Sequence, residues 1–378
     1  MNKLKKTLFF LFVSSLLIFF SMLAFLWWNH FPPLPEKFSP NIVCINEKAV
    51  FPIPKYLKMA SYNIHFGIGL KWNRQEALKK EDFEKRLNKI SEILKEINAD
   101  IVFLQEIDFN SARSKNIDQA NYLAEKAGYS YIAKAPYLRE RFHPNLQGLH
   151  GCINFGLCIL SRFPIKDHEV RIFPHPDEMP FYLKWLYNPH GAQKAIAKVG
   201  DNEITLINVH LEPWAQKTRE KESMEIASWI NKIKGPLILG GDFNAMPPET
   251  PNKKGHYLSD APWFIDRSKW DIENEKTIRI IRSIEGITDG IPPKTFLKNQ
   301  KAAFTYPSDS PKEMIDYIFA RYNAKVMYGY IFHRAKTASD HLPIVSYIKY
   351  LISSDINKIS DTTYPAKTPP ISKKIISQ

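Results

Sequence analysis

The pattern of apolar and polar positions divides the chain into a charge-free N-terminal run, a long central block and a polar tail. The run extends from Thr7 to Trp28, and a proline-dense segment over 29–54 predicts a stiff, extended linker behind it. The central block, residues 55–350, alternates short apolar runs with amphipathic ones and contains no internal repeat. The tail, residues 351–378, is polar and aperiodic, so we expect disorder there. This pattern predicts one folded domain.

The charge-free run predicts a membrane helix over residues 7–28. About 20 apolar residues in helical form match the hydrocarbon thickness of a bilayer. Three lysines among the first six residues favour a cytoplasmic N-terminus over 1–6, and Trp27 and Trp28 suit the far interface. One alternative is a cleaved signal peptide, which would release a secreted protein but usually has an apolar region of only about 7 to 15 residues. Another is the buried helix of a soluble protein. We expect an uncleaved anchor with the central block outside the cytoplasm.

Two amphipathic helices are predicted from apolar spacings of three and four residues. In residues 80–98 the apolar positions from Phe83 to Ile97 lie on one face. Residues 216–235 form the second helix. The residues expected to face inward there are Met224, Ile226, Ala227, Ile230 and Ile233. A shorter helix over 116–128 closes on Gly128.

Strand-like runs outnumber the helices. They cover residues 58–66, 99–107, 153–165, 193–199, 203–211, 236–243, 314–320, 325–332 and 342–351. Because each long helix has only one apolar face, the pattern favours two sheets packed on each other with helices outside. Segments 171–195 and 247–302 are expected to be insertions, and 135–150 a loop.

Composition and charge narrow the function classes. A hydrophobic content of 44% excludes a disordered chain. The net charge of +13 attracts polyanions such as nucleic acid, anionic lipid headgroups or phosphorylated small molecules, although a basic solvated surface would show the same charge. The three cysteines form no CxxC pair, so a structural zinc site is not expected. We expect three unpaired thiols, with a disulfide of Cys44 as the alternative in an oxidising compartment.

Polar residues with metal-binding or acid–base side chains occur at or next to the ends of several predicted strands. They are Asn63, Glu106, His210, Asp242, Asn244, Asp316, Asp340 and His341. Each alone has an ordinary explanation, such as a turn residue or a satisfied partly buried histidine. Asp316 is the exception, because a carboxylate between apolar neighbours must be paired or hydrogen-bonded.

The combined set predicts metal-assisted phosphoester hydrolysis. Oxygen donors without thiolates suit a hard cation, Mg²⁺ first, with Mn²⁺ or Ca²⁺ as alternatives. The two histidines supply general acid–base groups. Gly240 and Gly241 allow a close turn and a close approach of substrate, so that Asp242 can act on an attacking water and Asn244 can hold that water or a phosphate oxygen.

The ordered motifs resemble those of the endonuclease/exonuclease/phosphatase superfamily over about residues 56–350. They are SYNIHFG, DIVFLQEID, LSRFPI, INVHLE, LILGGDFNA, IDYIF and SDHLPIV. The resemblance implies a four-layered α/β sandwich, in which helices flank two packed mixed sheets, and Mg²⁺-dependent hydrolysis by in-line attack of water. His210 resembles the histidine of the deoxyribonuclease and sphingomyelinase branches, and the segment DFNSARSKNIDQANYLAEKAGYSYI resembles bacterial membrane-associated members.

The same resemblance implies roles for individual residues. Glu106, Asn63 and Asp340 resemble metal ligands or near-metal groups. Asp242 and Asn244 resemble the residues that activate or orient water and stabilise the transition state. His341 resembles the acid–base histidine that contacts phosphate, and Asp316 the carboxylate that orients it.

Two further residues are candidates for substrate binding. Arg113 could reach a phosphate, or it could be a solvated loop cation. Asn154 could line the cleft, or it could be an ordinary strand residue.

The sequence leaves the substrate open. We expect a monomeric, membrane-anchored phosphodiesterase acting on a lipid headgroup, nucleic acid or a small phosphodiester. A nuclease and a catalytically inactive binding module are the alternatives. The insertion 171–195 is rich in aromatic residues, which could lean into a lipid interface or pack onto the protein's own core. Its aromatic and large apolar residues are Phe173, Phe181, Tyr182, Trp185, Leu186 and Tyr187.

Overall fold

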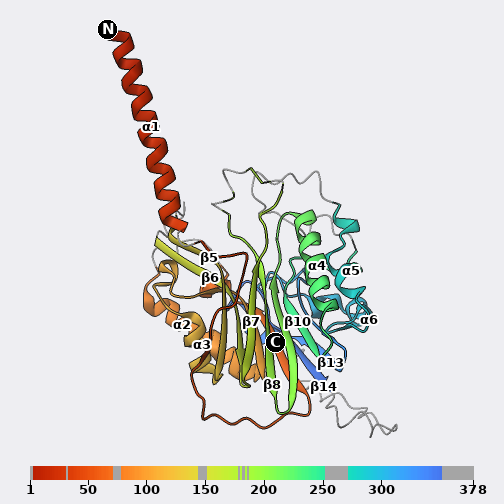
Figure 1. Ribbon diagram of the computed structural model, residues 1–378. Helices are drawn as coiled ribbons and strands as arrows, with labels where there is room; N and C mark the ends of the chain where they lie inside the picture. Colours follow the sequence, from red (N-terminus) through yellow and green to blue (C-terminus); the bar gives the residue numbers. More distant parts are fainter. Residues whose placement is uncertain are drawn as a thin grey trace, which may run out of the picture.

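Two sheets pack face to face between layers of helices in a computed structural model of the chain (Figure 1). The described residues are 3–30, 33–70, 78–143, 151–177, 179–180, 184, 187–251 and 271–350. The expected tail over 351–378 lies outside them, as do Phe181, Tyr182, Trp185 and Leu186.

The first sheet has the strand order β1-β7-β8-β9-β10-β12-β11. Its strands are β1 Lys37–Phe38, β7 Ile165–Ile172, β8 Gly191–Val199, β9 Asn202–His210, β10 Leu237–Asp242, β12 Asp316–Arg321 and β11 Thr288–Asp289. Strands β9 and β10 are parallel, and β12 runs antiparallel to β10. The last residues of β9 and β10 therefore lie side by side at one edge.

The second sheet has the order β13-β14-β3-β4-β6-β5-β2. Its strands are β13 Ala324–Ile331, β14 Ile344–Tyr350, β3 Leu57–Asn63, β4 Ile101–Asp108, β6 Gly151–Ser161, β5 Tyr131–His143 and β2 Ile42–Cys44. Strands β3 and β4 are the parallel pair here. Their apolar side chains are buried between the sheets, which forms the main core.

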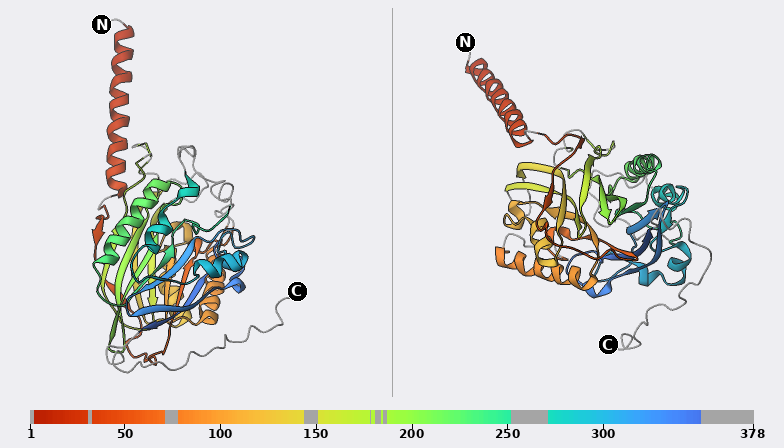
Figure 2. Two further views of the ribbon diagram at one scale, coloured as in Figure 1. Left: turned by 90° about the vertical axis from the view of Figure 1, so that its right-hand side faces the viewer. Right: turned by 60° about the horizontal axis from the view of Figure 1, so that its bottom comes forward.

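Helices cover the two outer faces (Figure 2). The helices are α2 Lys80–Ile97, α3 Gln119–Ala127, α4 Gln216–Asn231, α5 Thr277–Arg282 and α6 Pro293–Lys298. Short 3-10 turns are η1 His65–Gly67, η3 Ala112–Ser114, η6 Ile272–Asn274, η7 Gln300–Ala303 and η8 His333–Ala335. Helix α3 begins where the Asp118 carboxylate accepts the Asn121 N–H and ends at left-handed Gly128. Helices outside two packed sheets confirm the predicted four-layered sandwich.

The N-terminal helix α1, Lys3–His30, projects from the sandwich and exposes apolar side chains along its length (Figure 1). By length and composition it could cross a membrane. Its last turn contacts the end of β5: Asn29 Oδ1 accepts the Phe142 N–H at 2.6 Å, and the Arg141 guanidinium lies 5.3 Å from the Trp28 ring centroid. The ring of Phe25 also packs against Phe142. The end of α1 is therefore docked on the folded domain.

The proline-dense segment 29–54, expected as a spacer, contributes a strand to each sheet. Lys37 pairs with Arg171 of β7, and Val43 pairs with Ile132 of β5. This segment therefore belongs to the folded body, because backbone hydrogen bonds fix it to both sheets.

Other expectations need correction. Met224 is 53% exposed on α4, whereas Ile226 and Ile230 are buried as expected. The inward face of α4 includes the polar residues Arg219 and Glu222. A pattern based on hydrophobicity alone therefore assigns the wrong residues to the buried face of this helix.

Two strands were also misread. The predicted strand 153–165 ends early, because β6 stops at Ser161 and Ile165 already begins β7 after a turn. Residues 131–143, most of them expected as a loop, form β5, a strand of 13 residues.

The cysteines and two aromatic residues of the insertion 171–195 agree with the sequence expectations. All three cysteines are unpaired, as expected. Phe173 and Tyr187 of the aromatic insertion are buried, as its packing alternative predicts.

Candidate active site

Four strand ends from the two sheets meet at one end of the sandwich. Asn63 ends β3, Glu106 lies near the end of β4, His210 ends β9 and Asp242 ends β10. In the first sheet Asp242 is paired with His210 on one side and with Asp316 on the other. The parallel strand pairs place these side chains together, because the carboxyl ends of parallel strands lie at the same edge.

The Asn63 side chain joins the two sheets at this point. Its Nδ2 donates to Glu106 Oε1 and to Asp242 Oδ2, both at 3.0 Å. Its Oδ1 accepts the backbone N–H of His65 at 3.0 Å. Asn63 therefore fixes two carboxylates that belong to different sheets.

A buried pair of amides below the site joins β4 of the second sheet to β9 of the first. Gln105 Nε2 donates to Asn208 Oδ1 at 2.7 Å, and Asn208 Nδ2 donates to the carbonyls of Leu104 and Cys158, both at 3.1 Å. Gln105 directly precedes Glu106, and Asn208 lies two residues before His210. A satisfied polar network in a low-dielectric core restricts sliding of one sheet over the other.

Special backbone conformations present two of the side chains. Glu106 has φ +52° at a bulge between β4 and β6, and Asn244 has φ +47° after the end of β10. Non-glycine residues adopt positive φ at a cost of order 1 to 3 kcal/mol and mostly where the surrounding structure holds them. The bulge turns Glu106 out of the regular alternation of β4.

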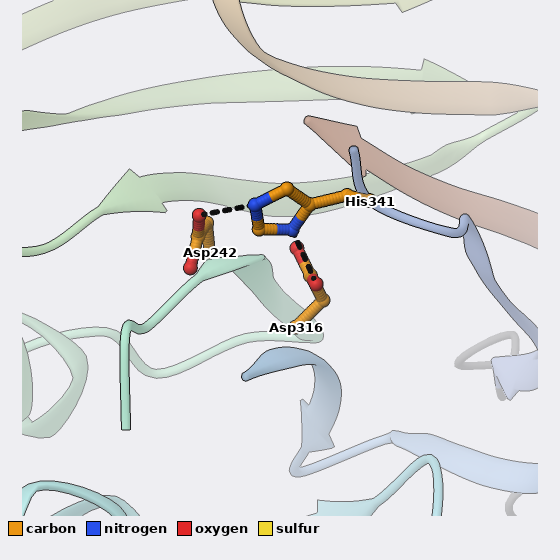
Figure 3. A group of neighbouring side chains, drawn as sticks. All are labelled: Asp242, Asp316 and His341. Carbon is orange, nitrogen blue, oxygen red and sulfur yellow. Dashed lines mark hydrogen bonds and ion pairs between the residues drawn. The ribbon is translucent and has the colours of Figure 1, made fainter. Parts of the chain in front are cut away.

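His341 lies between two carboxylates (Figure 3). Its Nδ1 is 2.9 Å from Asp316 Oδ2, and its Nε2 is 3.6 Å from Asp242 Oδ2. Although burial lowers the pKa of His341, the charges of Asp316 and Asp242 and the hydrogen bond that its Nδ1 donates to Asp316 raise it well above its usual value. His341 is therefore protonated at neutral pH. The pairing also meets the expectation that buried Asp316 needs a partner.

The pKa of the Asp242 carboxyl lies near neutral pH. Burial and the negative charge of Asp316 raise its pKa to about 7, against the opposing effects of His341, the Asn244 backbone N–H and Asn63. Asn244 N–H donates to Asp242 Oδ1 at 2.9 Å, and Asn244 Nδ2 donates to the Leu211 carbonyl at 2.8 Å. A carboxylate with such a pKa can take a proton near pH 7.

His210 faces Glu106 and Asp242 with its Nε2, at 3.9 and 3.7 Å, while its Nδ1 is 3.1 Å from the Tyr137 hydroxyl. Burial and nearby His190 lower the pKa of His210 to about 3, so the ring is neutral. Burial raises the pKa of Glu106, but His65, the hydrogen bond from Asn63 and the charge of His341 lower it by more, so the pKa is lowered overall and this carboxyl is ionised.

Asp340 lies at the side of the site with His65. Asp340 Oδ2 is 3.3 Å from His65 Nδ1, and Ser339 Oγ donates to Asp340 Oδ1 at 3.1 Å. Ser339 Oγ also lies 2.8 Å from the Asn63 carbonyl, which ties this loop to the end of β3.

The donor set fits a hard divalent cation. Within the described residues, none of the carboxylates Glu106, Asp242, Asp316 and Asp340 is ion-paired with lysine or arginine. The buried Oδ1 of Asp316 also has no hydrogen-bond partner there. Such a concentration of negative charge on oxygen donors suits Mg²⁺-type ions.

Two positions could hold the ion. One atom each of Asp242, Asp316 and His341 lies within 4.8 Å of the others. The second position is at the Glu106 carboxylate. The hydrogen bond between Asp316 and His341 already uses their facing atoms, so Glu106 is the better candidate for a metal ligand. Asn63 presents its amide nitrogen to Glu106, which suits a support of this carboxylate better than a ligand.

Arg113 and Asn154 make structural contacts. Arg113 is buried and donates to both oxygens of Asp108, between the rings of Phe66 and Phe155. Asn154 Nδ2 donates to the Phe109 carbonyl at 3.1 Å. Phosphate binding by Arg113 stays a prediction, and these contacts favour a role in shaping the wall of the site.

Sequence reasoning missed several residues around the site. Tyr137 gave no signal, because it lies in a strand expected as a loop. His65 is part of the SYNIHFG motif but drew no attention. His190 lies 4.8 Å from His210 between ring centroids, and Glu212 Oε2 lies 3.5 Å from His190 Nδ1. The quoted motif INVHLE contained Glu212, so its position two residues after His210 was a usable signal.

Comparisons with known proteins identify a family for most of the chain. Residues 60–341 match the profile described as the Endonuclease/Exonuclease/phosphatase family. A search of curated proteins found no match.

Several solved structures resemble the chain in fold. The endonuclease/exonuclease/phosphatase from Beutenbergia cavernae is 17% identical, with a TM-score of 0.54 over 79% of this chain and 72% of that one. The corresponding protein of Bacteroides vulgatus is 17% identical, with a TM-score of 0.51 over 79% and 100%. A family protein from Bacteroides thetaiotaomicron is 17% identical, with a TM-score of 0.50 over 78% and 94%.

Proposed function

The chain belongs to the endonuclease/exonuclease/phosphatase family of phosphoester hydrolases, and we propose that it is a Mg²⁺-dependent phosphodiesterase anchored in a membrane by α1. The observation that carries this proposal is the buried group of Asp242, His341 and Asp316, which Asn63 links to Glu106. It combines a base, Asp242, and an acid, His341, with the Glu106 carboxylate, which forms no ion pair with lysine or arginine among the described residues.

The proposed reaction adds water across one P–O ester bond. Asp242 accepts a proton from the attacking water, because a pKa of about 7 leaves much of it ionised at neutral pH. The water oxygen bonds to phosphorus and the opposite P–O bond breaks. His341, kept protonated and oriented by Asp316, gives its proton to the leaving oxygen. The products are a phosphomonoester and an alcohol.

Other residues of the site support these two. A divalent cation held by Glu106, with Asp340 nearby, would supply positive charge that polarises the phosphate. Neutral His210 can donate from Nε2 toward a phosphate oxygen, and Asn244 stays beside Asp242 to orient the water. These roles of His210, Asn244 and Asp340 remain part of the proposal.

A diester suits the site better than a monoester. A diester carries one negative charge at neutral pH, whereas a monoester carries up to two. The described part of the site offers four carboxylates and no ion-paired lysine or arginine to compensate the second charge. We therefore propose preference for the diester.

The length and exposure of α1 support the anchor, and its docked end argues against its removal. Asn29 is 4% exposed and bonded to β5, so cleavage after this residue would remove a docked part of the fold. The lysines before the apolar run support a cytoplasmic N-terminus and an extracytoplasmic catalytic domain. Retention in the membrane pellet after a carbonate wash is the expected result, and a soluble product beginning near residue 30 would contradict it.

The activity is tested with the full-length protein in detergent micelles. Bis-p-nitrophenyl phosphate is expected to be hydrolysed with Mg²⁺ and faster than p-nitrophenyl phosphate. Asp242→Asn and His341→Gln should each lower kcat by at least about 10²-fold. Asp100→Asn is the matched control, because this aspartate accepts the Lys58 N–H at the opposite end of β4. Folded protein without activity on any diester would favour a binding module and refute the proposal.

A further inference from the structure

The end of the membrane helix and the catalytic strand ends lie at the same end of the sandwich. One cross-strand row runs Lys37, Arg171, Ala192, Val209, Gly241 through five strands of the first sheet. The row starts seven residues after the end of α1 and passes directly beside the last residues of β9 and β10. In Figure 1, α1 and the loops that follow these strands are at the upper end.

The distances are short. Neighbouring strands lie about 4.8 Å apart, so three spacings between β1 and β9 amount to about 15 Å. In the second sheet, Phe142 contacts α1 and Tyr137, five residues earlier on the same strand, contacts His210. Five extended residues span about 17 Å. His210 thus lies within roughly 20 Å of the docked helix end.

A cavity is lined both by the end of α1 and by Tyr137, which contacts His210. It has a volume of about 410 Å³, and His30 from the end of α1 lines one side. Tyr137 and Tyr187 line it toward the active site, and exposed Arg139 and half-buried Lys184 also contribute to its wall. Through Tyr137 the cavity wall is one hydrogen bond away from His210.

The cavity lies at the level where lipid headgroups would be. Helix α1 has 28 residues and is about 42 Å long at 1.5 Å per residue, whereas the hydrocarbon core is about 30 Å thick. The last turn of α1 therefore lies in the headgroup layer. Because this turn is docked on β5, the cavity opens into the same layer.

The charges of the wall suit a phosphate-bearing headgroup. Arg139 and Lys184 provide two cations. The acid Glu140 in the same wall is paired with His143, whose Nδ1 lies 2.5 Å from Glu140 Oε2. Glu36 adds a further acid, so both signs are present. The net charge of +13 adds a general attraction to anionic lipid surfaces.

We infer that the substrate is a phospholipid of the bilayer that holds α1, with its headgroup bound in this cavity and its phosphodiester at the catalytic group. This inference rests on the proposed phosphodiesterase function. Water adds to phosphorus, one P–O ester bond breaks, and the lipid becomes a phosphomonoester and an alcohol. No other reactant is needed. The lipid can stay in the membrane, because its phosphate reaches the site by moving along the headgroup layer.

The test uses the full-length protein reconstituted in vesicles of phosphatidylethanolamine and phosphatidylglycerol, with bis-p-nitrophenyl phosphate as the soluble substrate. The measured quantity is the ratio of lipid turnover, by mass spectrometry, to turnover of the soluble diester. Arg139→Ala with Lys184→Ala should lower this ratio at least tenfold. Lys166→Ala with Lys198→Ala removes two cations from the opposite end of the sheet and should leave it unchanged.

A second variant tests the geometry without touching the cavity cations. Asn29→Ala with Phe142→Ala loosens the docking of α1. Lipid turnover should fall at least threefold while the soluble diester is hydrolysed as before.

Three results count against the inference. Wild-type protein that hydrolyses the soluble diester but no vesicle lipid refutes it and leaves the phosphodiesterase standing. An unchanged ratio in the cavity variant also refutes it. Failure of the wild type on both substrates refutes the proposed function, and the inference falls with it.

Discussion

Replacement of Tyr137 by phenylalanine isolates one hydrogen bond of the candidate site. Burial raises the pKa of Tyr137 well above its usual value, so its hydroxyl stays protonated. Because His210 is neutral and its Nε2 faces two carboxylates, the hydroxyl donates to Nδ1 and the imidazole proton sits on Nε2. Tyr137→Phe removes this donor and keeps the ring in place.

The size of the effect follows from the worth of one buried hydrogen bond. Such a bond contributes about 0.5 to 1.5 kcal/mol net. If the bond holds the reactive tautomer, its loss raises the barrier by the same amount, and kcat on bis-p-nitrophenyl phosphate falls about two- to tenfold. The unfolding free energy, measured by urea denaturation, falls by about the same 0.5 to 1.5 kcal/mol.

Tyr129→Phe is the matched control. The Tyr129 hydroxyl is also buried and donates to the Ala99 carbonyl at 3.1 Å, the same length as the bond from Tyr137. The two variants should lose similar stability, but only Tyr137→Phe should lose activity. Equal kcat values for the two would show that Tyr137 serves packing alone and would refute the assigned tautomer.

Three further predictions concern metal, charge and acid stability. Excess EDTA should abolish diester hydrolysis and Mg²⁺ should restore it, because the donors are oxygens; rescue by Zn²⁺ alone would contradict the metal assignment. Asp316→Asn removes a charge that raises the pKa of His341, so the alkaline limb of the kcat/KM profile should move to lower pH by at least about one unit; an unmoved limb would show that His341 is not the acid. His175 has its pKa lowered to about 4 by burial, His190 and Lys184, with Glu212 opposing them, so the native state binds this proton less readily than the unfolded state. Stability should therefore be complete above about pH 6.5 and fall toward pH 4, and His175→Asn should flatten this part of a melting-temperature profile, whereas an identical profile would contradict the shift.

The sequence predicts the site best where a single residue carries an unavoidable physical demand. Asp316 had to find a partner because its neighbours are apolar, and His341 supplies it. Asp242 follows two glycines at the end of an apolar strand, and it lies next to Asn63 and His341 in the candidate site. The two-sheet sandwich was also predictable, since the helices have one apolar face each.

The rest depended on contacts between distant segments. Tyr137 lies in β5, where proline and charged residues interrupt the alternation that identifies strands. On α4 the buried face includes Arg219, whose guanidinium pairs with Glu275 at 2.7 Å, so hydrophobicity alone pointed to Met224 instead. A charged residue can be predicted as a core residue only when its partner is known, and the partner of Arg219 lies 56 residues away in the sequence.

The two short strands before residue 55 have a consequence for handling the protein. Without β1 and β2, the backbone groups of Arg171 and Ile132 on the neighbouring strands would be left unpaired. Unpaired strand edges template pairing between molecules, so a fragment cut at residue 55 is expected to self-associate. A soluble form that begins at Pro33 keeps both edges covered, and light scattering should find it monodisperse where the shorter fragment aggregates.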